Sequence, residues 1–383
     1  MSLALGAHKG RTTYLYAGVN SSPESIEKGK NEHLRAFAIE QAKTRQSGAD
    51  KTASVKISEL SRSAMFTNPD KDSYQRLLRV VGGMGAAATG MGKESQLALF
   101  EAAGANPKVK GILELPRDVE DLDLIQTGDN EFQLAFCYKY ELHVVHIGKE
   151  TSEPELVYTM PEENSERPAF RSIRYLSRDF ILGASNLPGR KGIVLQALRL
   201  PAPVHNGQAR LAATVRIPGA VTARAMAVTN LSPPSSPTAP LGETQFVIAV
   251  AASDSSISVY TLEHITSSSI TLLTKFHPLY TIKDARGSIS DVAFSTFVLP
   301  KTHLRPQFIK LASSWLEEFV NVHSIPLTRY IDKTPRNKKG PPRPVRYVVA
   351  MKSHGPSALP VIIILSIMVL IMAILGQAVY NRL

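Results

Sequence analysis

The sequence is poor in cysteine and lacks the short motifs of common catalytic sites. Its 383 residues include one cysteine, Cys137. No disulfide can therefore form within the chain, which fits a reducing compartment, and a cysteine-based zinc site is poorly supported. The serine-hydrolase motif GxSxG and the metalloprotease motif HExxH are absent. We therefore expect no self-contained catalytic centre, and the catalytic residues stay unassigned.

A glycine-rich segment, Gly82–Lys93, has the composition of a phosphate-binding loop but not its residue order. Met91 stands where the lysine is required, and Glu94 stands where a serine or threonine would hold magnesium. The spacing GxGxxG does not fit either. We expect this segment to be a loop that enters a strand, and we assign no cofactor-binding residue.

Two histidines and the single tryptophan are weak candidates for a site. His143 and His146 are three residues apart, so on a strand they would point to opposite faces and could not share a metal ion. Trp315 replaces a small residue of a predicted strand, and packing is the favoured role. We predict no metal ligands in the chain.

One long run, Ala358–Val379, contains 22 residues and no charge. As a helix it would span about 33 Å, which matches a hydrocarbon core of about 30 Å. This pattern predicts a transmembrane helix over 358–379, followed by a lumenal tail at 380–383. A buried soluble helix is the less favoured alternative, because few such helices are apolar on every face.

The residues just before this run are strongly basic. Between Arg329 and Lys352 there are eight lysines and arginines and one acid, Asp332, so most of the formal net charge of +11 lies there. Basic segments stay cytosolic, which predicts a cytosolic N-terminus and no glycosylation at Asn20 or Asn230. We interpret the charge as a topology signal beside an anionic bilayer rather than as a nucleic-acid site. The same segment, 328–357, is rich in proline and predicts an extended linker.

The body, residues 1–327, shows a repeated strand pair: a small-residue apolar strand, a polar turn and an alternating strand. Copies begin near residues 14, 86, 132, 180, 245 and 307, and further strands precede some of them at 224–229 and 288–295. Small residues suit crowded inner strands near a central channel. The pattern predicts an all-β, WD40-like β-propeller that is six-bladed or open; a two-sheet sandwich is the alternative. The polar insertions 41–71 and 230–240 are predicted to be mobile surface loops.

Several segments in order resemble fungal members of the Sec-twelve family of guanine-nucleotide exchange factors. The resemblance covers essentially the whole chain from about Thr13, and it rests on these segments: Gly18–Ser22, Gly29–Phe37, Ser73–Arg79, Lys191–Leu195, Ser253–Tyr260 and Ile282–Ala285. It implies a seven-bladed propeller at the endoplasmic reticulum membrane that activates a Sar-type small GTPase and so starts coat-complex-II vesicles. A further location on Golgi membranes is compatible with this resemblance. Such a regulator makes and breaks no bond of its own.

The sequence departs from this family at its start. The family's first blade carries a glycine-rich loop that holds a potassium ion and helps to expel nucleotide, and nothing before Tyr14 resembles it. Residues 1–10, MSLALGAHKG, are too few for a blade, so no potassium ligand is expected in this chain. The alternative functions are a membrane-tethered propeller scaffold without exchange activity, or a truncated inactive form.

Overall fold

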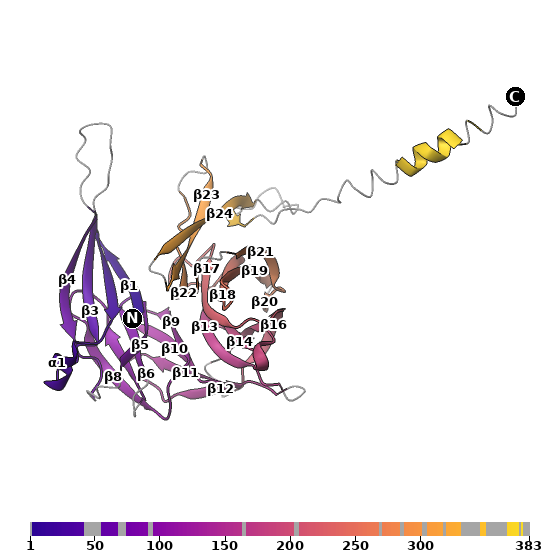
Figure 1. Cartoon of the computed structure of the whole chain (residues 1–383). Coiled ribbons are helices and arrows are strands. Elements are labelled where there is room, and N and C mark those ends of the chain that lie inside the picture. The colour runs from indigo at the N-terminus through magenta and orange to yellow at the C-terminus, as the bar shows by residue number, and fades with distance from the viewer. Residues whose placement is uncertain are drawn as a thin grey trace, which may run out of the picture. The chain divides into compact units, whose positions relative to one another are not determined.

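A computed structural model describes most of the chain (Figure 1). The described residues are 2–41, 55–67, 74–90, 95–162, 166–202, 207–267, 270–283, 287–300, 305–316, 319–330, 345–349, 366–374 and 377. The chain divides into two compact units, Met1–Val348 and Val349–Leu383.

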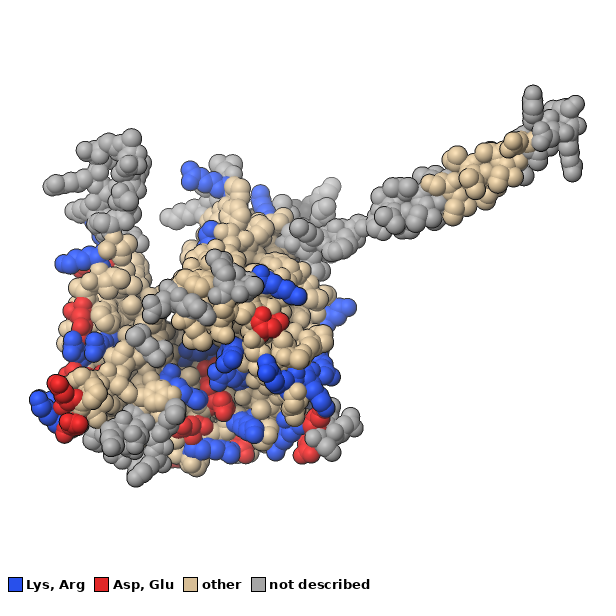
Figure 2. Space-filling view, in the orientation of Figure 1, with Lys and Arg blue, Asp and Glu red and all other residues tan. Residues whose placement is uncertain are grey.

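The second unit is described at few positions. Residues 366–374 are helical and their side chains are exposed, and this stretch presents only uncharged atoms (Figure 2). Among the described residues, no helix combines the length and the apolar composition needed to cross a bilayer. The predicted span 358–379 and tail 380–383 lie mostly or wholly outside the described residues.

The first unit consists of six antiparallel sheets, or blades, in chain order. Blade 1 consists of β1 (Ser2–Lys9), β2 (Thr12–Gly18), β3 (Leu34–Gln41) and β4 (Val55–Ser63). Blade 2 consists of β5 (Tyr74–Val81), β6 (Met84–Gly90), β7 (Ser95–Glu101) and β8 (Lys108–Leu115). Blade 3 consists of β9 (Asp121–Gly128), β10 (Glu131–Cys137), β11 (Glu141–Ile147) and β12 (Glu155–Thr159). Blade 4 consists of β13 (Ala169–Ser177), β14 (Phe180–Asn186), β15 (Ile193–Arg199) and β16 (Arg210–Ile217). Blade 5 consists of β17 (Ala223–Asn230), β18 (Thr244–Ala252), β19 (Ser256–Ser267), β20 (Ile270–Leu273) and β21 (His277–Lys283). Blade 6 consists of β22 (Ile289–Phe294), β23 (Gln307–Trp315), β24 (Val320–Tyr330) and β25 (Arg346–Val348). Two short helices, α1 (Pro23–Glu27) and η1 (Pro188–Arg190), lie in connections. The predicted all-β propeller is therefore confirmed, with six blades.

Each predicted hairpin is the second and third strand of a blade, but the small-residue strand is not the innermost one. The first strand of each blade lines the channel, and the small-residue strand lies next to it, as β18 does with every residue buried. Small residues are needed there because neighbouring blades cover both faces of the strand. Crowding within a blade acts in the same direction: in β6, a Cβ atom on Gly85 would lie 2.1 Å from the ring of Phe100, its partner on β7.

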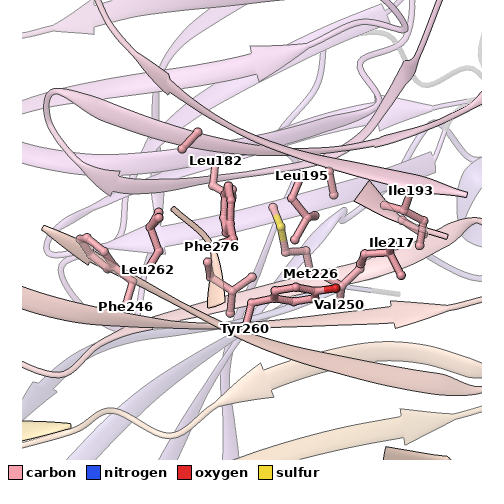
Figure 3. Packing of buried hydrophobic residues seen from close by; sticks show 14 of the residues in the cluster. Leu182, Ile193, Leu195, Ile217, Met226, Phe246, Val250, Tyr260, Leu262 and Phe276 are labelled. Atoms are coloured by element: carbon pink, nitrogen blue, oxygen red, sulfur yellow. The ribbon is translucent and has the colours of Figure 1, made fainter. Parts of the chain in front are cut away.

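Adjacent blades are held together by apolar clusters. Between blades 4 and 5, Leu182 and Leu195 pack with Met226, Phe246 and Tyr260 (Figure 3). Burying one such large side chain contributes about 1.5–3 kcal/mol relative to leaving it exposed. Comparable clusters join blades 1 and 2, 2 and 3, and 3 and 4.

Both predicted insertions contain structured residues. Within 41–71, Val55–Ser63 is β4, because its residues pair with β3 and complete blade 1. In the loop 230–240, Leu231 is fully buried. The side-chain oxygen of Asn230 accepts hydrogen bonds from the backbone N–H of Ser232 at 2.8 Å and from the hydroxyl of Thr244 at 2.6 Å. These contacts hold the first residues of the loop against blade 5, although the loop was predicted to be mobile.

The two ends of the propeller add strands to the predicted hairpins. Ser2–Lys9 forms β1, the first strand of blade 1, within the predicted body 1–327 but before the first hairpin copy, which was placed near residue 14. The body was expected to end at 327, but β24 continues to Tyr330 and pairs with β25. Tyr347 of β25 is buried against Phe297, with ring centroids 5.7 Å apart. One added strand completes the sheet at each end of the propeller, because the other three strands of that sheet follow β1 or precede β25 in the chain.

The first strands pack side by side in the order β1, β5, β9, β13, β17 and β22. β1 and β22 are the two ends of this order, and among the described residues they do not pack against each other as the other neighbouring first strands do. We call this interruption the seam. Figure 1 shows its two boundaries, the indigo sheet β1–β4 and the orange strands β22–β24.

Apolar sheet faces bound the seam. In blade 1, Tyr16 pairs with Ala4 and reaches blade 2, where its hydroxyl donates to the carbonyl of Ala102 at 2.9 Å. Leu3 and Leu5 flank Ala4, so they lie on the opposite face. In blade 6, the exposed residues alternate along β23 with fully buried ones. The exposed apolar residues, which we call the seam faces, are Leu3, Leu5, Val55 and Ile57 on blade 1 and Phe308, Val320 and Val322 on blade 6, each 47–64% exposed.

Candidate binding site at the mouth of the central channel

A cavity of about 420 Å³ lies where the first strands begin, and we call it the channel mouth. All six blades contribute to it, because their first strands enter the channel in the same direction. Its charged lining residues are five arginines and three acids: Arg76, Arg79, Arg171, Arg174, Arg224, Glu120, Asp121 and Asp291.

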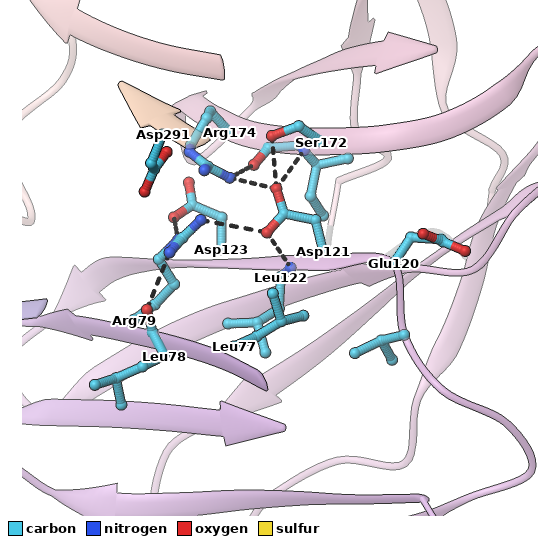
Figure 4. A network of polar contacts seen from close by, with 12 residues as sticks. Leu77, Leu78, Arg79, Glu120, Asp121, Leu122, Asp123, Ser172, Arg174 and Asp291 are labelled. Carbon is cyan, nitrogen blue, oxygen red and sulfur yellow. Dashed lines mark hydrogen bonds and ion pairs between the residues drawn. The ribbon is translucent and has the colours of Figure 1, made fainter. Parts of the chain in front are cut away.

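Asp121, at the start of β9, organises the inner part of the mouth (Figure 4). Five donors surround its buried carboxylate: the Ser172 hydroxyl at 2.6 Å, the Ile173 N–H at 3.0 Å, Arg174 Nη1 at 2.5 Å, the Leu122 N–H at 2.9 Å and Arg79 Nη2 at 3.3 Å. Since Arg79 lies on β5 and Arg174 on β13, one carboxylate joins blades 2, 3 and 4.

Burial and charge compete in this network. Burial opposes ionisation of Asp121, but Arg174 and Arg79 outweigh it and hold the pKa of this carboxyl below its usual value. Burial raises the pKa of Asp123, although its carboxylate accepts the Tyr175 N–H at 2.7 Å and lies 3.9 Å from Arg79 Nε. Burial, and then repulsion by Arg174, lowers the pKa of Arg79. Asp121 is therefore the group that stays charged and keeps both arginines in place.

Three further arginines of the mouth have little compensation. Arg76 donates to the backbone carbonyls of Val119 and Glu120, which carry no net charge, and its buried Nε has no partner. Arg171 Nη1 lies 3.7 Å from the carboxylate of Glu120. Arg224 is exposed and makes no hydrogen bond or ion pair with any described residue. Of these three guanidinium groups, Arg171 is the one with a carboxylate of a described residue within 4 Å.

The glycine-rich segment lies away from this site. Gly82 and Gly83 form the turn between β5 and β6, and Gly82 has a φ of +59° that favours glycine. Met84–Gly90 then forms β6, while residues 91–94 lie outside the described part. The predicted loop that enters a strand is therefore the turn Gly82–Gly83, whereas Met84–Gly90, which was predicted as part of the loop, is the strand itself.

The predicted weak candidates also lie elsewhere. His143, on β11, stacks on Phe136 with ring centroids 5.2 Å apart, and in the described part of the chain no group of three or more His, Cys, Asp or Glu could hold a metal ion. Trp315 is buried at the end of β23 and stacks on Phe319 with centroids 5.2 Å apart, which confirms packing. Cys137 is buried, and burial raises the pKa of its thiol well above the usual value.

The arginines and acids of the channel mouth were not singled out in the sequence. Each lies on or just before the first strand of a blade, three to nine residues before the connection to the small-residue strand. A charged residue recurring in that strand was the available signal. It was missed because the repeat that we recognised begins only at the second strand of each blade.

The comparisons with known proteins add no family. No protein-family model matches the chain, and no curated protein matches it. Similar solved structures include the Nup133 β-propeller domain of Vanderwaltozyma polyspora, with 9% identity, a TM-score of 0.43 and coverage of 76% of this chain and 77% of that one. Drosophila Semaphorin 1a has 8% identity, a TM-score of 0.42 and coverage of 84% and 74%. Sqt1 of Saccharomyces cerevisiae has 9% identity, a TM-score of 0.38 and coverage of 91% and 92%. These values indicate no more than a distant likeness in fold, and the sheet topology itself defines the chain as a six-bladed β-propeller.

Proposed function

We propose that this chain is a membrane-tethered β-propeller scaffold that binds another protein. The observation that carries the proposal is the pair of seam faces, where seven large apolar side chains are 47–64% exposed. Several large apolar side chains exposed on two neighbouring sheets are typical of an interaction site, and on blade 6 Lys310 lies beside Phe308 on the same face.

The occupant that fits the seam is a blade-like β-sheet with apolar side chains on both faces. The seam faces continue the arrangement of the filled blade interfaces, in which alternate residues of one sheet pack on those of the next. A helix or an extended peptide would cover one seam face and leave the other exposed.

A more specific candidate is guanine-nucleotide exchange on a Sar-type GTPase, favoured by the ordered resemblance of segments such as Gly29–Phe37 and Ser253–Tyr260. Exchange needs no acid–base pair. A protein that binds the nucleotide-free GTPase best lowers nucleotide affinity by linkage. In the family, the wedge that enters the nucleotide site belongs to the first blade, so a sheet placed in the seam would bring it.

We expect the full chain in detergent to accelerate GDP release from a Sar-type GTPase weakly, and the same chain extended upstream by a family-like first blade to do so strongly and in a potassium-dependent way. The measurement is release of fluorescent GDP, together with retention of the nucleotide-free GTPase on the immobilised propeller.

Equally strong release by both forms would place the wedge within residues 1–383 and contradict our interpretation of the glycine-rich loop. Retention of the GTPase without faster release from either form would favour the scaffold without exchange activity. Neither retention nor release would refute the GTPase as partner.

The tether in this proposal is the run Ala358–Val379, placed in the endoplasmic reticulum membrane with the propeller in the cytosol. The described helical residues support an anchor, because apolar side chains are exposed around the helix: Ile367, Met368, Val369, Leu370, Ile371, Met372 and Ile374 are each at least half exposed. A bilayer would remove this surface from water.

Changing Val369→Arg should weaken membrane insertion by about 2.5–3.5 kcal/mol, the cost of an arginine near the centre of a spanning helix. The measurement is the fraction of protein that resists alkaline carbonate extraction. The matched control is Val298→Arg, which changes a valine of the propeller that is 76% exposed and should leave extraction unaltered. Unchanged association of Val369→Arg would argue against a single simple span.

A further inference from the structure

We propose that the channel mouth binds a small anion that carries two or more phosphate or carboxylate charges. The ligand would lie between Arg76, Arg171 and Arg224, which come from blades 2, 4 and 5 and line the same cavity. This inference does not depend on the proposed exchange activity or on the membrane tether.

The first argument is charge. Arg79 and Arg174 are matched by Asp121 and Asp123 in the inner network. The outer part of the mouth holds three arginines against Glu120 and Asp291, a difference of one positive charge. An excess of positive charge therefore remains around the cavity, and an anion would neutralise it.

The second argument is hydrogen bonding. A guanidinium has five N–H donors, and here the exposed Arg224 makes no polar contact with any described residue. The hydroxyls of Ser290 and Ser314 line the same cavity and hydrogen-bond each other at 2.8 Å, so at most one of them has a proton left to donate. Oxygens of a phosphate or a carboxylate are the acceptors that match such a set.

The third argument is rigidity and size. Each of the three arginines lies on a first strand that is paired within its blade and packed between neighbouring first strands, so the backbone that carries them needs little ordering on binding. A cavity of about 420 Å³ lies within the usual range for small-molecule sites. It is too small to enclose a nucleic-acid duplex, whose major groove alone is about 12 Å wide.

The test is calorimetric titration of the full chain in detergent with inorganic pyrophosphate, and in parallel with citrate, to distinguish phosphate from carboxylate recognition. We expect saturable binding of at least one of them, accompanied by a rise in Tm. Arg224→Gln should weaken it at least tenfold, because a charge-assisted hydrogen bond is lost and no contact within the protein is disturbed. Arg171→Gln should weaken it in the same direction.

The matched control is Arg210→Gln, which removes an exposed charge at the start of β16, outside the cavity lining. It should leave the affinity unchanged. Absence of saturable binding of both probes would overturn the proposal. So would an equal loss of affinity in Arg210→Gln and Arg224→Gln, since this would indicate unspecific charge screening.

Discussion

Replacing Asp121 by alanine should lower the free energy of unfolding by about 3–5 kcal/mol, the usual cost of removing one partner of a buried ion pair. The variant leaves Arg79 and Arg174 facing each other without the carboxylate between them, and it removes the acceptor of five hydrogen bonds. Chemical denaturation of the full chain in detergent measures the loss.

Asp179→Ala is the matched control. The side chain of Asp179 is 54% exposed and lies 3.8 Å from Arg178, so the loss should stay below about 1 kcal/mol. Adding Arg174→Met to Asp121→Ala should restore part of the stability, because one uncompensated buried charge disappears. If the double variant is no more stable than Asp121→Ala, charge is not the reason for the loss.

Lowering the pH from 7 to 4.5 should destabilise the propeller by about 2–3 kcal/mol through His33 alone. Burial lowers the pKa of this ring from 6.5 to about 4. Its Nδ1 accepts the backbone N–H of Met65 at 3.2 Å, and its ring packs edge-on against Phe66 at 4.8 Å. Between pH 6.5 and 4, the unfolded chain takes up a proton that the folded ring does not, so stability falls as the pH falls.

The variant His33→Asn isolates this contribution, since an asparagine oxygen can accept the same N–H but does not titrate in this range. Its stability should depend less on pH than that of the wild type, measured by denaturation at several pH values. Asp121, whose folded pKa is lowered, loses its stabilising effect only below this window, and Asp123 contributes equally to both proteins. His277→Asn, which changes a half-buried histidine of β21, should retain the wild-type slope. An unchanged slope in His33→Asn would contradict the assignment.

The hairpins of every blade could be predicted from the sequence because their patterns are local. Residues 245–262 show a buried run followed by alternation, and they form β18 and the first half of β19 as expected. β1 and β25 could not be predicted in this way. β1 has eight residues and β25 has three, and each acquires its place by pairing, β1 with β2 and β25 with β24.

The channel mouth depends on contacts between blades, so a charged residue that recurs before each hairpin cannot by itself show which side chains meet. Arg79, Asp121 and Arg174 are separated by 42 and 53 residues in their hydrogen bonds. In the sequence, these three residues are charged side chains of three separate strands. Only the stacking of the first strands shows that a carboxylate in blade 3 holds guanidiniums from blades 2 and 4.

The seam gives the propeller the cooperativity of a linear stack rather than that of a closed ring. In such a nearest-neighbour array, the stability of each unit depends on its own folding and on the interfaces beside it. Blades 1 and 6 have one interface each within the described part of the chain, and the other blades have two. Unfolding can therefore begin as fraying at either end and stop at the central blades, where the Asp121 carboxylate links three sheets at once.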